Sequence, residues 1–442
     1  MGLFGRLFGN APSNEVQPDI RFGRYTDAYK TDEQYDAWDR ALMQFEEQNY
    51  LTAYREFFDY LRDQDAGNVR YWMEGEELKF ELFQGSKRIT GFANKKQLGA
   101  KAKIALSEDL NIGFMQRLLQ QNHDLKYSRY TLDGDHHISI LFDSFTLDGS
   151  PYKLYYALKE LATSADKQDD LLIDEFRMLK PVETDHLQAI PDKEKEVKYQ
   201  FMRREIGAVL DGMDNGQQPV QEYPGGVAYL ILHLSYKLDY LISPEGFMME
   251  TLERIHRRYF EKAPQSSIEK NKILYNELRA LYERPKAALF KEMYRVPSTF
   301  GITSPVNHDR VEQFIQGELG NMDWYLENGY EEIALGIPGY IVGYCLFNYA
   351  IPKPDRDFFH LFYQITEPDY FSQLGFSLRY YDSRKKQFNK RAIRRAIREV
   401  VEQNRDIYYK LHPNTAILEF DHIAKFARSY LLMVRELDLS KN

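Results

Sequence analysis

The segment of this chain with the clearest chemical character covers residues 384–398, RKKQFNKRAIRRAIR. It holds eight basic residues and no acidic one, and its apolar residues recur at helical spacing. An apolar stripe on one helix face is formed by Ile393, Ile397, Val400 and Val401. Another face carries the basic side chains of Lys390, Arg391, Arg394, Arg395 and Arg398. Three interpretations stay open: a face matched to the protein's own carboxylates or to solvent, a site for an acidic protein or lipid, and a site for nucleic acid.

Acidic and histidine side chains also gather around an Asp-Gly turn, at Asp133, Asp135, His136 and His137. These residue types can ligate a metal ion. Adjacent side chains in a strand point to opposite faces, however, and Asp-Gly is ordinary turn chemistry. We therefore predict a hairpin tip here and no metal site.

A second group, Asp355, Asp357 and His360, follows Pro354 at helical spacing. Acidic residues stabilise the N-terminus of a helix, so this position explains them without a catalytic acid–base pair.

Cys345 is the only cysteine of the chain, and it lies among Tyr344, Leu346 and Phe347, as expected for a buried, inert thiol. One cysteine excludes an intramolecular disulfide and a cysteine-based zinc cage. The sequence contains no P-loop, strand-linked GxGxxG, GxSxG, HExxH or EF-hand pattern. We therefore predict no catalytic residue, cofactor or metal. An enzyme stays a third hypothesis, because catalytic residues need not be adjacent in sequence.

The composition is that of a globular chain with two or three domains. Of 442 residues, 43% are hydrophobic and 28% charged, and the formal net charge is −9. This acidic balance argues against broad coating by nucleic acid. The first residues, MGLFGRLFG, lack the long apolar region of a secretory signal, and Arg6 breaks the myristoylation pattern. We expect a cytoplasmic protein.

The first 180 residues predict a tail followed by an α+β module. Residues 1–30 show no sustained period and are interpreted as a flexible tail. Residues 31–180 begin with a helical hairpin, with Trp38, Phe45, Tyr50 and Phe57 on its apolar faces. Period-two strands follow at 69–73, 78–83, 88–92 and 100–106, then a helix over 109–121 and a strand hairpin over 127–142. In the helix we expect Phe114, Met115, Leu118 and Leu119 to point inward.

This order of elements resembles the fold shared by type III secretion chaperones and the bacterial proteins called putative sensory-transduction regulators. The resemblance covers residues 50–165 and rests on the order helix, antiparallel strands, helix, two strands, helix, with the LDGD hairpin at 132–135. The preceding hairpin resembles a single tetratricopeptide repeat, and the phrase FGRYTDAYKTDEQYDAW resembles an uncharacterised bacterial family. The resemblance implies capture of a partner segment or dimerisation through the module, and it brings no catalytic motif.

The C-terminal half is predicted to be mainly helical. Residues 181–223 form a charged connecting helix and a loop, 224–300 a helical region, and 301–442 a mainly helical domain that follows a linker at 296–309. The 19-residue uncharged run at 333–351 approaches membrane-spanning length, but Pro338 and Asn348 favour a buried helix. Its glycines at 336, 339 and 343 leave room for close packing. The similar stretches 224–244 and 338–354 leave a duplication open.

From these patterns we expect a non-catalytic, adaptor- or chaperone-like protein that binds a protein partner and that has the option of forming a homodimer. The candidate contact residues are Tyr127, Tyr130 and the basic helix. The rival hypothesis is a nucleic-acid-binding or regulatory protein that uses the basic helix.

Overall fold

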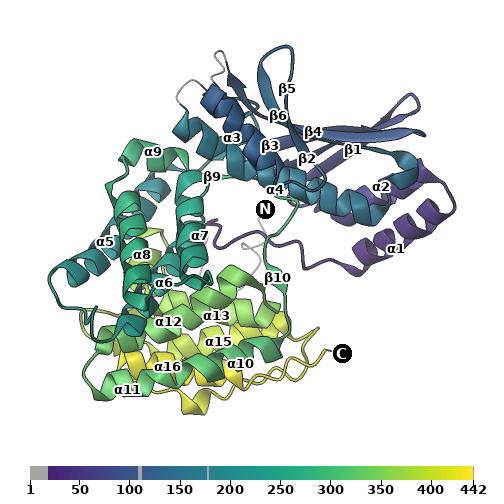
Figure 1. The fold of residues 1–442 in the computed structure, drawn as a ribbon. Coiled ribbons are helices and arrows are strands. Elements are labelled where there is room, and N and C mark those ends of the chain that lie inside the picture. The colour runs from purple at the N-terminus through teal and green to yellow at the C-terminus, as the bar shows by residue number, and fades with distance from the viewer. Residues whose placement is uncertain (1–17, 108–111, 177–178, 442) are drawn as a thin grey trace.

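The computed structural model describes residues 18–107, 112–176 and 179–441. Figure 1 shows a sheet with its covering helices, built by the N-terminal third of the chain, beside a larger helical part that contains the C-terminal half. The α+β class predicted from the sequence is confirmed. The two parts are called the sheet module and the helical half below.

The sheet module begins with a helical hairpin, α1 (Asp32–Glu46) and α2 (Tyr50–Leu61). Thr31 and Gln34 form a capping box that fixes the start of α1. The antiparallel sheet has the order β1-β2-β3-β4-β6-β5, and β7 pairs with β4. Its strands are β1 (Val69–Glu74), β2 (Glu77–Gln84), β3 (Lys87–Ala93), β4 (Gln97–Ser107), β5 (Arg129–Leu132), β6 (His137–Phe145) and β7 (Leu179–Pro181).

One face of this sheet is covered by helices. The long helix α4 (Pro151–Glu175) contacts β2, β3, β4 and β6, and α2 contacts β1. Leu78, Phe80 and Leu82 of β2 point into this core, as their alternation predicts, because successive strand residues point to opposite faces. The helices and the sheet therefore share one core.

Helix α3 (Ile112–Asn122) differs from the prediction on one face. Phe114 and Leu118 are buried as expected, but Met115 and Leu119 are exposed and do not point inward. Together with Ile112 they form a stripe on the outer face of the helix, because residues three and four apart lie side by side.

Among the described residues, the helical half has twelve helices, which pack around a second core. Its helices are α5 (Asp192–Asp214), α6 (Pro224–Ile242), α7 (Gly246–Phe260), α8 (Ser267–Glu283), α9 (Lys286–Lys291), α10 (His308–Leu319), α11 (Asn321–Glu327), α12 (Glu331–Asn348), α13 (Lys353–Thr366), α14 (Pro368–Gln373), α15 (Lys390–Asn404) and α16 (Ile423–Arg435). The described residues also form three two-stranded sheets of two residues per strand. These pair β8 (Gln188–Ala189) with β9 (Tyr294–Arg295), β10 (Ser304–Pro305) with β11 (Tyr349–Ala350), and β12 (Tyr381–Asp382) with β13 (Gln387–Phe388).

The uncharged run forms α12, which is buried along most of its length and packs against α6. Its three glycines face α6 side chains: Gly336 meets Leu230, Gly339 meets the His233 ring, and Gly343 meets Tyr236. The two similar stretches of the sequence are thus neighbouring helices. In the described part of the chain, no helix combines the length and the apolar character needed to cross a membrane.

Two segments without regular structure cross between the sheet module and the helical half. Residues 1–30 were predicted as a flexible tail. Residues 1–17 lie outside the described part of the chain, but within 18–30 Ile20 and Phe22 are buried in the core of the helical half. Residues 296–302, predicted as part of a linker, bury Phe300 in the core of the sheet module. Gln84 accepts hydrogen bonds from the backbone N–H groups of Thr299 (3.2 Å) and Phe300 (2.9 Å). The two parts are therefore fastened by both crossings.

Candidate functional site

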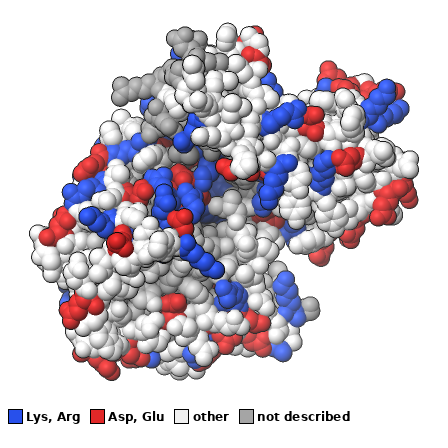
Figure 2. Space-filling model, in the orientation of Figure 1, with Lys and Arg blue, Asp and Glu red and all other residues white. Residues whose placement is uncertain are grey.

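A cavity of about 540 Å³ lies where the two parts meet. Its walls come from the crossing segment at 21–25, the β2–β3 turn, α4, α5, the end of α6, and α7. Figure 2 shows basic and acidic side chains gathered around a hollow between the two parts. This cavity is called the cleft below, and it is the candidate functional site.

Arg24 is the central cation of the cleft. Its guanidinium donates to both carboxylate oxygens of Asp239 (2.8 and 2.6 Å) and to Glu253 (2.7 Å). It also lies 4.2 Å from the centre of the Phe347 ring. The preceding Gly23 adopts φ +72° and donates its N–H to the Tyr240 carbonyl (2.8 Å), which holds the segment against the end of α6. The crossing segment therefore delivers a fixed positive charge to the helical half.

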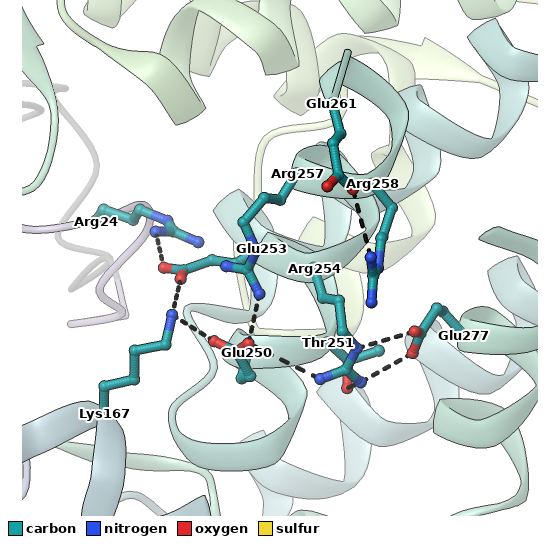
Figure 3. Close-up of polar contacts among 10 residues, drawn as sticks. All are labelled: Arg24, Lys167, Glu250, Thr251, Glu253, Arg254, Arg257, Arg258, Glu261 and Glu277. Atoms are coloured by element: carbon teal, nitrogen blue, oxygen red, sulfur yellow. Dashed lines mark hydrogen bonds and ion pairs between the residues drawn. The ribbon is translucent and has the colours of Figure 1, made fainter. Parts of the chain in front are cut away.

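Lys167 connects the sheet module to the same network. From α4 it contacts Glu250 (2.6 Å) and Glu253 (3.2 Å), both on α7. Figure 3 shows Lys167 and Arg24 approaching Glu253 together, with Arg257 reaching Glu250 (2.8 Å). One carboxylate thus joins the crossing segment, the sheet module and the helical half.

A second group of cations lines the cleft, formed by Arg21, Lys198 and Arg295. Lys198 pairs with Glu194 (2.9 Å), and Arg295 pairs with Asp19 (2.9 Å). Arg21 donates instead to a neutral acceptor, the Val296 carbonyl (2.9 Å). Among the described residues, no carboxylate lies within ion-pair distance of Arg21.

The environment shifts the protonation equilibria of these groups. Burial would lower the pKa of Arg24, but Asp239 and Glu253 outweigh it and raise this pKa. Burial lowers the pKa of Arg21 and of Lys198, although nearby carboxylates oppose both shifts. Burial and Arg24 lower the pKa of His256 to about 4, which keeps this imidazole neutral beside the Tyr236 hydroxyl (2.7 Å). The cleft therefore holds Arg24, whose positive charge is stabilised by two carboxylates, close to a neutral histidine.

The residues predicted from the sequence do not form one site. Tyr127 is exposed on the sheet module, and its N–H donates to Glu160 (2.9 Å). Tyr130 on β5 is half-buried and packs against the module core, and burial raises its pKa. The five predicted basic residues lie on α15 of the helical half, and all are exposed: Lys390, Arg391, Arg394, Arg395 and Arg398.

The hairpin tip brings possible metal ligands together. Ligand atoms of Asp133, Asp135 and His137 all lie within 4.8 Å of one another. Asp133, however, already accepts from Lys101 (2.9 Å) and from the His137 backbone N–H (2.8 Å). His136 adopts φ +63° as part of the turn. The geometry is explained by turn chemistry, so we assign no metal to it.

Asp355, Asp357 and His360 lie on α13 and have separate partners. Asp355 is buried against His308 (2.8 Å). Asp357 contacts Lys353 (2.5 Å), and His360 contacts the Tyr240 hydroxyl (3.0 Å). These three side chains therefore do not form one common site.

The cleft residues were missed by sequence reasoning. Arg24 lies in the predicted tail, and its two carboxylate partners are 215 and 229 positions away. No local periodicity connects residues so far apart. The one available signal is Arg24 itself, within the phrase FGRY.

Comparison with known proteins adds no assignment, since no family model and no curated protein matches this chain. The fold and the cleft define a two-part α+β protein with a charged cavity between its parts. The function proposed below therefore rests on the chemistry of the described residues.

Proposed function

We propose that this chain is a binding protein whose cleft holds a small anionic ligand between the sheet module and the helical half. The observation that carries the proposal is Arg21, a guanidinium in the wall of a 540 Å³ cavity whose described partner is a neutral carbonyl. Lys198 and Arg295 each form a direct ion pair. The carboxylate of Glu245 raises the pKa of Arg21 against the effect of burial, but without forming such a pair in the described structure. A half-buried guanidinium without a directly bonded carboxylate has N–H donors available for an anionic ligand.

The surroundings of Arg21 favour an anion over a neutral ligand. Besides burial, the positive charge of Arg295 lowers the pKa of both Arg21 and Lys198. Glu245 and Glu194 act on these two pKa values in the opposite direction. An anionic group between these cations would relieve their mutual repulsion. A guanidinium also presents parallel N–H donors that match a carboxylate or phosphate group.

The size and walls of the cleft agree with a small molecule. Its volume lies within the range of about 300–1,000 Å³ that is typical of ligand pockets. The fixed pairs around Arg24 and Lys167 hold the walls in place, so little ordering remains to oppose binding. The cleft therefore has the charge, volume and rigidity of a binding site.

The test compares Arg21→Gln with Arg55→Gln, a matched change at an exposed arginine on α2. Thermal unfolding is measured with millimolar inorganic phosphate, mononucleotides, sugar phosphates and tricarboxylates. We expect at least one anion to raise the Tm of the wild type and of Arg55→Gln, and Arg21→Gln to lose the increase. If no anion raises the Tm of the wild type, the proposal fails.

Protein binding, the function predicted from the sequence, is a second candidate that a separate observation favours. Ile112 and Leu119 on the outer face of α3 are 79% and 66% exposed, and Met115 lies between them. Exposed apolar stripes of this kind are typical of protein-binding surfaces. Here the partner would cover α3 and leave the cleft untouched.

A pair of leucines tests this second candidate. Leu119→Glu places a charge in the α3 stripe, whereas Leu378→Glu makes the same change at an exposed leucine of the helical half. We expect a co-purifying protein, or a dimer in sedimentation, to persist in Leu378→Glu and disappear in Leu119→Glu. A wild-type chain that sediments as a monomer and retains no protein contradicts the candidate.

A further inference from the structure

The basic face of α15 is exposed and largely unmatched by the protein's own carboxylates. Among its five basic residues, Arg395 has an ion pair in the described structure, with Glu399 (2.8 Å). Lys390 and Arg394 lie over the Phe420 ring at 5.3 and 5.6 Å. In the described contacts, Arg391 and Arg398 have no carboxylate partner. Pairing with the protein's own carboxylates thus accounts for one residue of five, and the alternative that the face is only solvated predicts no binding of a polyanion.

The preceding turn extends this positive surface. Residues 384–386, Arg-Lys-Lys, connect β12 to β13, and all three are exposed. Asp382 accepts the backbone N–H groups of Arg384 (3.1 Å) and Lys385 (3.0 Å), which fixes the turn. We define the polyanion face as these three residues together with the five basic residues of α15.

The apolar side of the same helix is buried in the core of the helical half. Ile393, Ile397 and Val400 are 0–3% exposed, and Phe388 and Val401 are half-buried. A membrane-surface helix inserts its apolar side into the lipid, and protein interfaces are anchored by apolar or aromatic side chains. The polyanion face offers neither, so its chemistry is almost purely electrostatic.

A partner recognised by charge alone must carry a dense, regular row of anions. From Lys390 to Arg398 the helix axis advances by about 12 Å, and a DNA duplex presents about seven phosphates over such a distance. We infer that the polyanion face binds the phosphate backbone of a nucleic-acid duplex without reading its sequence. The site is separate from the cleft and independent of the function proposed for it.

The net charge of −9 does not exclude this local binding. At about 0.1 M salt, charges separated by more than about 10 Å are largely screened, so the sign of the local surface decides. The same screening makes the interaction strongly salt-dependent, which gives it a measurable signature.

The test measures the anisotropy of a labelled DNA duplex of mixed sequence against the full chain over a range of salt concentrations. The Arg394→Glu/Arg395→Glu variant should bind at least tenfold more weakly, and its slope of log K against log salt should be less steep by about two. The control is Arg55→Glu/Lys96→Glu, with the same charge change on exposed residues of the sheet module. It should bind like the wild type.

Circular dichroism first establishes that each variant is folded. The inference is overturned if the wild type does not bind the duplex at low salt, or if the control loses as much affinity as the α15 variant. Vesicles containing phosphatidylserine form the second arm. Vesicle binding without duplex binding also overturns the inference, because it identifies a lipid surface as the partner.

Discussion

The cleft and the polyanion face use the same residue types in opposite physical settings. In the cleft, Arg24 is 11% exposed and shares Asp239 and Glu253 at 2.6–2.8 Å. On α15, Arg395 is 48% exposed, and its one carboxylate partner, Glu399, is itself 38% exposed. The first arrangement fixes charges inside the protein, whereas the second leaves them in solvent.

This difference indicates which charged residues stabilise the fold and which are accessible to a binding partner. Removing a buried cation leaves its carboxylate partners uncompensated, which costs far more than the loss of an exposed pair. Exposed pairs are also screened by salt, whereas buried pairs are screened much less. We therefore expect stability to depend on the cleft, and salt-sensitive binding to depend on α15.

The largest expected effect on stability comes from removing the buried cation, Arg24. Arg24→Met keeps much of the side-chain volume but leaves Asp239 and Glu253 without their shared cation. We expect a loss of about 3–5 kcal/mol in the free energy of unfolding, measured by urea denaturation.

The matched change on the exposed side is Arg391→Met on α15. It should change the free energy of unfolding by no more than about 0.5 kcal/mol, as surface substitutions usually do. Equal losses in the two variants would show that burial does not separate the two groups of cations.

The sequence predicted the local elements of both regions because their signals are local. The period of two in β2 and the apolar stripe at Ile393 and Ile397 each follow from neighbours within a few positions. The burial of the uncharged run as α12 was also predicted correctly, since Pro338 and Asn348 argue against a membrane span.

The cleft lay beyond such reasoning because it depends on contacts between distant segments. Residues 18–30 have no regular period, so nothing local distinguishes a flexible tail from a segment held by Asp239. Phe300 was likewise hidden in a linker, although it is buried in the sheet module. On α3, Met115 and Leu119 were placed inward, because apolar character alone does not reveal which of two faces is covered.

A substitution that changes no charge tests how closely α6, which carries Asp239, packs on α12. Asp239 lies on α6, which packs on α12 through Gly339, and a Cβ added at Gly339 would overlap the His233 ring. Gly339→Ala should therefore destabilise the protein by about 1–3 kcal/mol through overpacking, and Gly339→Leu by at least as much.

The control for Gly339 is Gly317→Ala on α10, where an added Cβ would meet nothing within 4 Å. It should raise the free energy of unfolding by about 0.5–1 kcal/mol, because alanine favours a helix interior over glycine. A destabilised Gly317→Ala, or an unchanged Gly339→Ala, would contradict close packing of α6 on α12.

The smallest expected loss of stability concerns a buried group whose charge depends on pH, unlike the arginines compared above. Burial and Arg356 lower the pKa of His360 to about 3, and its ring packs against Phe22 of the crossing segment, with ring centroids 5.1 Å apart. The folded pKa lies below the unfolded value of about 6.5, so the unfolded state takes up the proton first as the pH falls. This contribution to stability is complete above the unfolded pKa and is lost below it, by about 1 kcal/mol between pH 7 and pH 5.5.

We expect His360→Gln to lose about that much less stability than the wild type over this interval in urea denaturation, whereas His412→Gln, at an exposed position, should follow the wild type. If His360→Gln follows the wild type as well, His360 is charged in the folded protein, and the crossing segment is not packed on a neutral ring.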